Sequence, residues 1–257
     1  MKNVLTIAGK ELRSYFVSPI AYVVLTGFLL LGGWFFWNLL ARFNFYLSLY
    51  QALRNPEALA RLNLNDLVIA PLLHNLSVVL VILVPVITMR SFAEEKKGGT
   101  YELLLTSPLS ITEIVLGKFF AAFAFVAIMV GLTGVYPLIL SLYGNPEVGV
   151  IAGGFLGLLL LGTAFVAVGL LTSSFTENQI IAAVSCLVAL LLLYVISWPA
   201  ENAGETVGAL LKYISVTEHF GEMVKGLIDT RDLVYFGSVI VLALFLTQRS
   251  VESIRWR

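Results

Sequence analysis

The chain has 257 residues, of which 59% are hydrophobic and 12% are charged, and its net charge is zero. A soluble domain carries about 25% charged residues, so a water-soluble core of ordinary proportions is excluded and the lipid bilayer is the expected solvent. Zero net charge leaves no basic surface for nucleic acid, and the single cysteine, Cys186, can form no disulfide within the chain and is expected to be a packing residue.

The first predicted element is an amphipathic helix within residues 1–18. Its apolar side carries Leu5, Ala8, Leu12, Tyr15 and Phe16. Its polar side carries Lys2, Lys10, Arg13 and Ser14. Such a helix is expected to lie in the membrane interface, and Ser18-Pro19 to end it. It is read either as a simple positively charged anchor or as a part with a mechanical role. No small-residue cleavage site follows the next apolar run, which favours a retained segment over a cleaved signal.

Six apolar runs are each long enough to cross about 30 Å of hydrocarbon, which takes about 20 residues. They are 20–41, 67–89, 113–143, 148–171, 179–198 and 233–247. The third is longer than a span requires and contains Pro137, so a tilt or kink is expected there. The predicted fold is an all-α polytopic membrane protein with six transmembrane helices, forming one domain over residues 1–257.

The distribution of positive charge predicts the orientation in the membrane. With the N-terminus in the cytoplasm, the inner segments hold ten of the sixteen lysines and arginines. The positive-inside rule favours this arrangement, which places both termini in the cytoplasm. The membrane that the chain crosses is expected to be the inner membrane of the cell.

The cytoplasmic connection between the second and third spans, residues 90–112, is charged and contains several residues that typically begin or end helices. The second span is expected to continue as a helix to about Lys97, where Gly98-Gly99 ends it. Thr100 can then cap a new short helix that carries Glu102 in its first turn and stops at Pro108. Because so short a helix is unstable alone in water, it needs a surface to pack on.

Capping boxes are predicted at both inner turns. Ser110-x-x-Glu113 precedes the third span, with Leu109 and Ile114 at the hydrophobic staple positions. Thr176-x-x-Gln179 is predicted to cap the fifth span in the same way, with Phe175 and Ile180 as its staple. Both turns are therefore expected to be rigid.

Two outer segments carry shorter helical patterns. Residues 54–66 are expected to include one short helix. In residues 199–232 the apolar stripe Val207, Leu210, Leu211 and Ile214 is followed by Phe220, Met223, Val224 and Leu227. Two amphipathic helices that dip into the outer leaflet would bury these stripes, either as a lid over the bundle or as an ordinary surface loop.

The spans contain no ionisable residue near their centres, and Glu113 and Lys118 are expected at interface depth. This disfavours an ion-coupled secondary transporter, which needs such groups. No nucleophile–base pair or metal cluster indicates a membrane enzyme, and no Walker motif is present to bind ATP. Gly153-x-x-x-Gly157 predicts close helix packing. Any work that the protein does must therefore be powered by a partner.

The stretch EEKKGGTYELLLTSPLSITEIVLGK resembles the cytoplasmic signature of ABC-2 type transporter permeases, E-x-x-x-G-T-x-E-L-L-x-x-x-P. TSSFTENQIIAAV resembles the second inner turn of that family, and VTEHFGEMVKGLIDTRDLVYF its outer segment before the last span. GKELRSYFVSPIAYVV resembles the N-terminus of the gliding-motility and nitrous-oxide-maturation type permeases within it.

The resemblance implies an export-type permease subunit that is not itself an enzyme and binds no cofactor. A cytoplasmic ATPase subunit would bind ATP and Mg²⁺, and a second six-span permease, identical or related, would complete the transporter among membrane lipids. The ATPase-coupling residues carried over are Glu94, Glu95, Thr100, Glu102, Leu103, Leu104 and Pro108. Lys10, Glu11 and Arg13 would belong to the connecting helix, and Phe220, Met223, Val224 and Leu227 to an outer gate. A membrane scaffold that transmits ATPase motion without transport is the alternative within this family.

Overall fold

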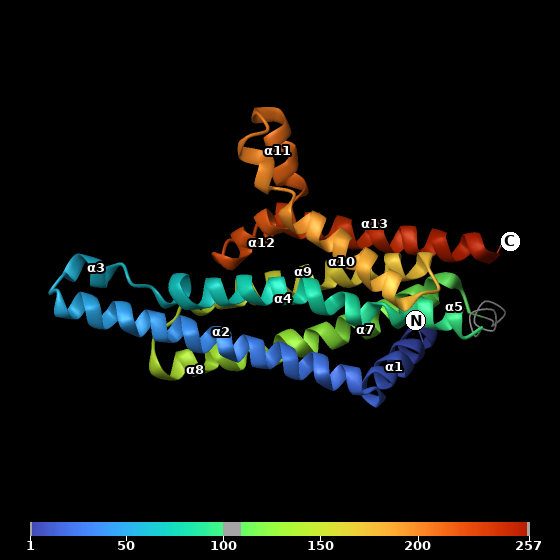
Figure 1. The fold of residues 1–257 in the computed structure, drawn as a ribbon, viewed down its shortest axis with the longest axis horizontal. Helices are drawn as coiled ribbons and strands as arrows, with labels where there is room; N and C mark the ends of the chain where they lie inside the picture. The colour runs from blue at the N-terminus through green and yellow to red at the C-terminus, as the bar shows by residue number, and fades with distance from the viewer. Residues whose placement is uncertain (1, 100–108, 256–257) are drawn as a thin grey trace.

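The structure, a computed structural model, describes residues 2–99 and 109–255, and within them all regular secondary structure is helical (Figure 1). Six helices are long and apolar enough to cross a membrane, which confirms the predicted all-α, six-span fold. They cover Pro19–Ala52, Asn65–Lys97, Ile111–Tyr143, Val148–Phe175, Gln179–Ala200 and Thr230–Ser253. Every span is at least as long as its predicted run because the helices continue past the apolar core into polar ends.

The first half of the chain forms α1 (Lys2–Val17), α2 (Pro19–Ala52), α3 (Pro56–Ala60), the π-helical turn η1 (Asn65–Ile69), α4 (Ala70–Thr88), α5 (Arg90–Lys97), α7 (Ile111–Thr133) and α8 (Val135–Tyr143). The second half forms α9 (Val148–Phe175), α10 (Gln179–Val195), the 3₁₀ turn η2 (Trp198–Glu201), α11 (Glu205–Ile214), α12 (Val216–Val224) and α13 (Thr230–Arg255). Helix α3 confirms the short helix expected in residues 54–66. We call the end of the bundle that holds α1, α5 and both termini the base, and the end that holds α3 the tip (Figure 1).

Helix α9 is the centre of the bundle, in contact with α4, α5, α7, α10, α12 and α13. Its glycines allow close approach. A Cβ added at Gly157 would lie 2.9 Å from Met223 Cβ, and one at Gly153 would lie 3.1 Å from the Met223 carbonyl oxygen. The Gly-x-x-x-Gly motif therefore does permit tight packing, as predicted, and its partner is the short helix α12.

The third span is divided at Gly134, where α7 ends and α8 begins. Pro137 has no N–H to bond the carbonyl of Thr133, so the ladder cannot continue through this point. The expected disturbance near Pro137 is thus confirmed. Beyond the break, α8 is held to α2, because the Tyr136 hydroxyl donates to the Leu29 carbonyl at 2.6 Å.

The two predicted amphipathic helices in residues 199–232 are present as α11 and α12, but they are covered differently. Phe220, Met223 and Val224 of α12 are fully buried against the bundle. The stripe of α11 stays open, with Val207 and Leu210 more than half exposed, and α11 stands away from the bundle in Figure 1. The prediction that Leu227 continues the α12 stripe is wrong, because α12 ends at Val224. Leu227 is 59% exposed and lies after Gly226, whose φ of +82° follows the end of the helix.

The first of the two predicted capping boxes is confirmed. Ser110 accepts from the Glu113 N–H and the Glu113 carboxylate accepts from the Ser110 N–H, at 3.2 and 3.1 Å. The second is wrong. Asn178 is the N-cap of α10 and accepts from the N–H groups of Ile180 and Ile181. Thr176 ends α9 in an extended conformation, and its hydroxyl accepts from the Asn178 N–H. Phe175 and Ile180 are both exposed, so no staple forms.

Replacing Asn178 with alanine is expected to lower the free energy of unfolding by about 1 kcal/mol, the usual cost of losing an N-cap side chain. Thr176→Ala is the matched control, because within the described residues the Thr176 hydroxyl accepts only from the Asn178 N–H, which lies before the first residue of α10. Denaturant unfolding in detergent micelles measures both. An effect of Thr176→Ala equal to that of Asn178→Ala would restore the predicted Thr176–Gln179 cap.

Candidate functional site

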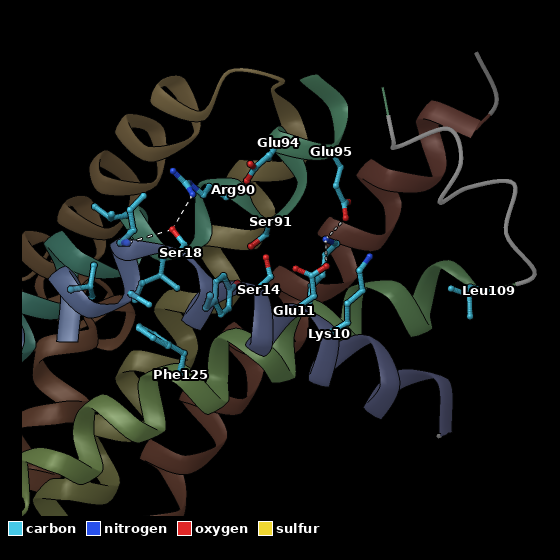
Figure 2. A pocket seen from close by; sticks show the side chains of 17 residues that line it. Lys10, Glu11, Ser14, Ser18, Arg90, Ser91, Glu94, Glu95, Leu109 and Phe125 are labelled. Atoms are coloured by element: carbon cyan, nitrogen blue, oxygen red, sulfur yellow. Dashed lines mark hydrogen bonds and ion pairs between the residues drawn. The ribbon is translucent and has the colours of Figure 1, made fainter. Parts of the chain in front are cut away.

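At the base of the bundle, α1, α5 and α7 meet around one buried lysine. Lys118, in α7, is 2% exposed. Its Nζ lies 3.1 Å from Glu11 Oε1 of α1 and 2.7 Å from Glu95 Oε1 of α5, and it also lies 5.3 Å from the centre of the Phe92 ring. Figure 2 shows Glu11 and Glu95 reaching toward the same point from their two helices. We call Glu11, Glu95 and Lys118 the Lys118 cluster.

Helix α1 reaches this cluster because α7 has a glycine beneath it. A Cβ added at Gly117 would lie 2.5 Å from Ile7 Cγ2 and 3.3 Å from the Val4 carbonyl oxygen. The absent side chain therefore lets the α1 backbone lie directly on α7. The Asn3 amide adds a second link by donating to Glu113 Oε1 at 3.0 Å. Helix α1 thus packs on the protein itself, and of its predicted apolar stripe Leu12, Tyr15 and Phe16 contact the core while Leu5 remains exposed.

Helix α5 is fixed on its other side to α9. The Ser173 hydroxyl accepts from the N–H groups of Phe92 and Ala93 at 3.1 and 3.2 Å and donates to the Met89 carbonyl at 3.1 Å. It thereby bonds backbone groups at the point where α4 passes into α5. The Lys96 Nζ donates to the Ser174 carbonyl at 2.5 Å. The segment that leads into the predicted hairpin is consequently bonded to two other helices, to α9 through Ser173 and Ser174 and to α7 through Glu95 and Lys118.

A cavity of about 530 Å³ lies between α1, α2, α4, α5 and α7, and the Lys118 cluster lines part of its wall. One part of its wall is polar, with Lys10, Ser14, Ser18, Arg90 and Glu94 (Figure 2). The other part is apolar and comes from the spans, with Ala21 and Val24 of α2, Val86 of α4 and Phe125 of α7. Burial raises the pKa of Tyr15, which also lines the cavity, to about 12, so this hydroxyl remains neutral at physiological pH.

The structure brings together only some of the residues predicted to form the coupling site. Glu95 and Glu11 belong to the Lys118 cluster, while Lys10 and Glu94 line the same cavity. Arg13 is exposed and contributes to neither. The other predicted coupling residues lie outside the described residues. They are Thr100, Glu102, Leu103, Leu104 and Pro108.

Two buried ionisable groups were not recognised from the sequence as functional or structural centres. One is Lys118, whose place in the first turns of a span was noted without its partners. The other is His219, whose Nδ1 lies 2.7 Å from Asp232 Oδ1 and whose Nε2 lies 3.0 Å from the Tyr213 carbonyl oxygen. The His219 ring also stacks on Tyr235 at 4.0 Å. This pair ties α12 to α13. The two residues are thirteen positions apart in the sequence, and the segment between them carries no pattern that would have indicated the pair.

A family model described as ABC-2 family transporter protein matches residues 5–248. The chain belongs to this family. A search of curated proteins finds no match for it. As an ABC-2 protein it is a multi-pass membrane component of an ABC transporter, a type of subunit that is generally non-catalytic and typically pairs with an ATPase subunit. The narrower resemblance to gliding-motility and nitrous-oxide-maturation permeases stays a prediction.

The match takes in both the base and the outer helices of the ABC-2 protein. Within residues 2–99 and 109–255, no group of three or more histidine, cysteine, aspartate or glutamate side chains is placed to hold a metal ion. At the base, Lys118 instead pairs with carboxylates from two other helices. Such an arrangement can hold helices together and transmit a displacement between them.

Proposed function

We propose that this ABC-2 protein is the permease subunit through which a separate ATPase subunit drives export of a substrate. The observation that carries the proposal is the Lys118 cluster. It joins α5 and α7, the helices on either side of residues 98–110, to one another and to α1. A force applied to that connection would therefore move three helices as one unit. Breaking one partner of a buried ion pair costs about 3–5 kcal/mol, so the unit resists separation.

The displacement has two routes away from the base. Through α5 it passes to α4 and, by the Ser173 and Ser174 contacts, to the central helix α9. Helix α9 in turn packs against α12 at Gly153 and Gly157, in a part of the bundle remote from the base. In this proposal residues 90–112 form the coupling hairpin, residues 1–18 the connecting helix and residues 199–232 the outer gate, all within one domain with cytoplasmic termini in the inner membrane.

A second six-span permease, identical or related, would complete the transporter. The face of α10 that bears Ile180, Val184, Val188 and Leu192 is exposed and apolar. Most of this span is not covered by the rest of the protein. That face supports either a partner permease or lipid as its neighbour. The partner ATPase would hold ATP and Mg²⁺, and the subfamily of gliding-motility and nitrous-oxide-maturation permeases remains our proposal for the closest functional type.

Substitutions in the predicted coupling helix test this function. Glu102→Arg and Leu104→Asp are each expected to release the ATPase subunit from membranes while the permease stays inserted. The first reverses a charge in the proposed docking surface, and the second introduces a charge at an apolar position. Co-purification of the ATPase with a tagged permease measures this. Glu205→Arg and Leu210→Asp on α11 are matched controls, since they make the same changes at exposed positions far from the base. Normal recovery of the ATPase with both hairpin variants would contradict the coupling assignment.

One observation favours the scaffold alternative. Helices α2 and α3 extend toward the tip beyond α12 and α13 (Figure 1), where an assembly outside the membrane could contact them. ATPase activity of the reconstituted complex separates the two functions. A transporter is expected to show ATPase activity that rises with an added substrate, whereas a scaffold is expected to respond to the assembly it contacts.

A further inference from the structure

The polar part of the base cavity contains an arginine with incomplete hydrogen bonding. Arg90 begins α5, and one of its terminal nitrogens lies 3.5 Å from Ser18 Oγ, at the limit of a hydrogen bond. Its Nε is buried and has no hydrogen-bond partner within the part of the chain that the structure describes. A buried donor on a charged group is costly to leave without an acceptor. This guanidinium therefore favours a ligand with acceptor oxygens.

The groups around Arg90 define the chemistry of that ligand. Ser14 of α1 and Ser18, the N-cap residue of α2, supply hydroxyls on the same part of the wall. Glu94 lies one helical turn further along α5, at the exposed rim, and no ion pair joins it to Arg90 among the described residues. Lys10 and the three members of the Lys118 cluster line the same cavity. The site thus presents the Arg90 cation inside, with Lys10 and Glu94 at exposed positions on its wall. The Lys118 cluster does not compete, because its charges are directed at one another.

The rest of the wall is suited to hydrocarbon. Ala21, Val24, Val86 and Phe125 belong to membrane-spanning helices and line the cavity without any polar side-chain group. The volume of about 530 Å³ is within the range of roughly 300–1,000 Å³ found for small-molecule sites. A ligand that fills the whole cavity must therefore be an amphiphile, with its charged part at Arg90 and its apolar part among the spans.

We propose that this cavity binds a membrane phospholipid with an amine-bearing headgroup. The phosphodiester oxygens accept from the Arg90 guanidinium and from Ser18, since the planar fork of arginine matches phosphate geometry. The headgroup amine lies at Glu94, and one acyl chain lies along Val24 and Phe125. Bound in this way, the lipid joins α1 and α5 to the spans, and its binding does not depend on the ATPase.

Binding of phospholipid to the purified, delipidated permease tests the proposal. Titration with phosphatidylethanolamine in detergent, followed by native mass spectrometry, is expected to show one saturable site per chain. Arg90→Gln is expected to weaken binding by about tenfold or more, because the charge-assisted hydrogen bonds are lost. Arg249→Gln is the matched control. It removes the same charge at the same end of the bundle, from an exposed arginine paired with Glu252, and is expected to bind as the unaltered protein does.

Two further variants keep the test decisive if Arg90→Gln folds poorly. Ser14→Trp fills the headgroup region from an exposed position and is expected to abolish the site without a change of charge. Glu94→Gln is expected to remove the preference for phosphatidylethanolamine over phosphatidylglycerol. Lipid binding that is unchanged in Arg90→Gln or Ser14→Trp would overturn the proposal and identify the lipid as a general boundary lipid. Equally tight binding of inorganic phosphate or glycerophosphoethanolamine would overturn it too, since neither has an acyl chain.

Discussion

Replacing Lys118 with methionine is expected to lower the free energy of unfolding of the permease by about 3–5 kcal/mol. The lysine is 2% exposed and is paired with carboxylates from two other helices. Methionine fills much of the same space but leaves Glu11 and Glu95 facing each other without the cation. Two carboxylates in a partly buried site repel, and neither can be fully hydrated there. The loss should be among the largest that a single substitution in this chain can produce.

Equilibrium unfolding in mixed micelles is the measurement. Lys225→Met is the control, because Lys225 pairs with Glu222 at the surface, with 65% of its side chain exposed, and is expected to show no measurable change. Adding Glu11→Gln and Glu95→Gln to Lys118→Met is expected to recover most of the loss, since neutral groups in one buried site are tolerated. A Lys118→Met protein as stable as Lys225→Met would mean that the cluster does not hold the three helices together.

Replacing Gly117 with leucine is expected to detach α1 from α7. Even a Cβ at this position would meet Ile7 Cγ2 at 2.5 Å and the Val4 carbonyl oxygen at 3.3 Å. Overpacking usually costs about 1–3 kcal/mol when side chains can adjust, but here the backbone of α1 is in the way. The helix must therefore move as a whole, and Glu11 then loses its contact with Lys118. Hydrogen exchange in residues 2–17 is expected to accelerate by about tenfold or more, as for a locally opened segment.

Gly131→Leu is the matched control for this variant. It makes the same substitution in the same helix, at a position where an added Cβ has no described atom within 4 Å. Its hydrogen exchange in α1 is expected to equal that of the unaltered protein. Comparable acceleration in both variants would assign the effect to α7 itself, and unchanged exchange in Gly117→Leu would contradict the close packing of α1 on this glycine.

Much of the fold could be predicted from the sequence because its determinants are local. Apolar runs of membrane length gave the six spans, and the helix end at Gly98-Gly99 is confirmed by a φ of +69° at Gly99. The Ser110–Glu113 cap was also predictable, since both of its hydrogen bonds lie within four residues. The N-cap of α10 was misplaced by two residues because Thr176 and Asn178 are both good caps, and only the structure shows which one begins the helix.

The candidate site was less predictable because its contacts are between distant residues. Lys118 is separated by 107 residues from Glu11 and by 23 from Glu95, and nothing in the local pattern pairs them. The outer helices show the same difficulty. Helices α11 and α12 have similar apolar stripes, yet only the α12 stripe is covered. Periodicity identifies the apolar face of a helix but does not say what packs against it.

The length of α2 has a consequence for the surface that the protein presents outside the bilayer. Its 34 residues make a rod of about 51 Å, against about 30 Å of hydrocarbon. Counted from Pro19, the exposed Trp34 and Trp37 fall where aromatic side chains favour the boundary between lipid and water. The remaining turns, which carry Arg42 and Tyr46, then rise about 22 Å above that boundary. The last turns of α2 therefore project as a continuous helix into the aqueous phase, and a molecule could bind them there without contacting the membrane.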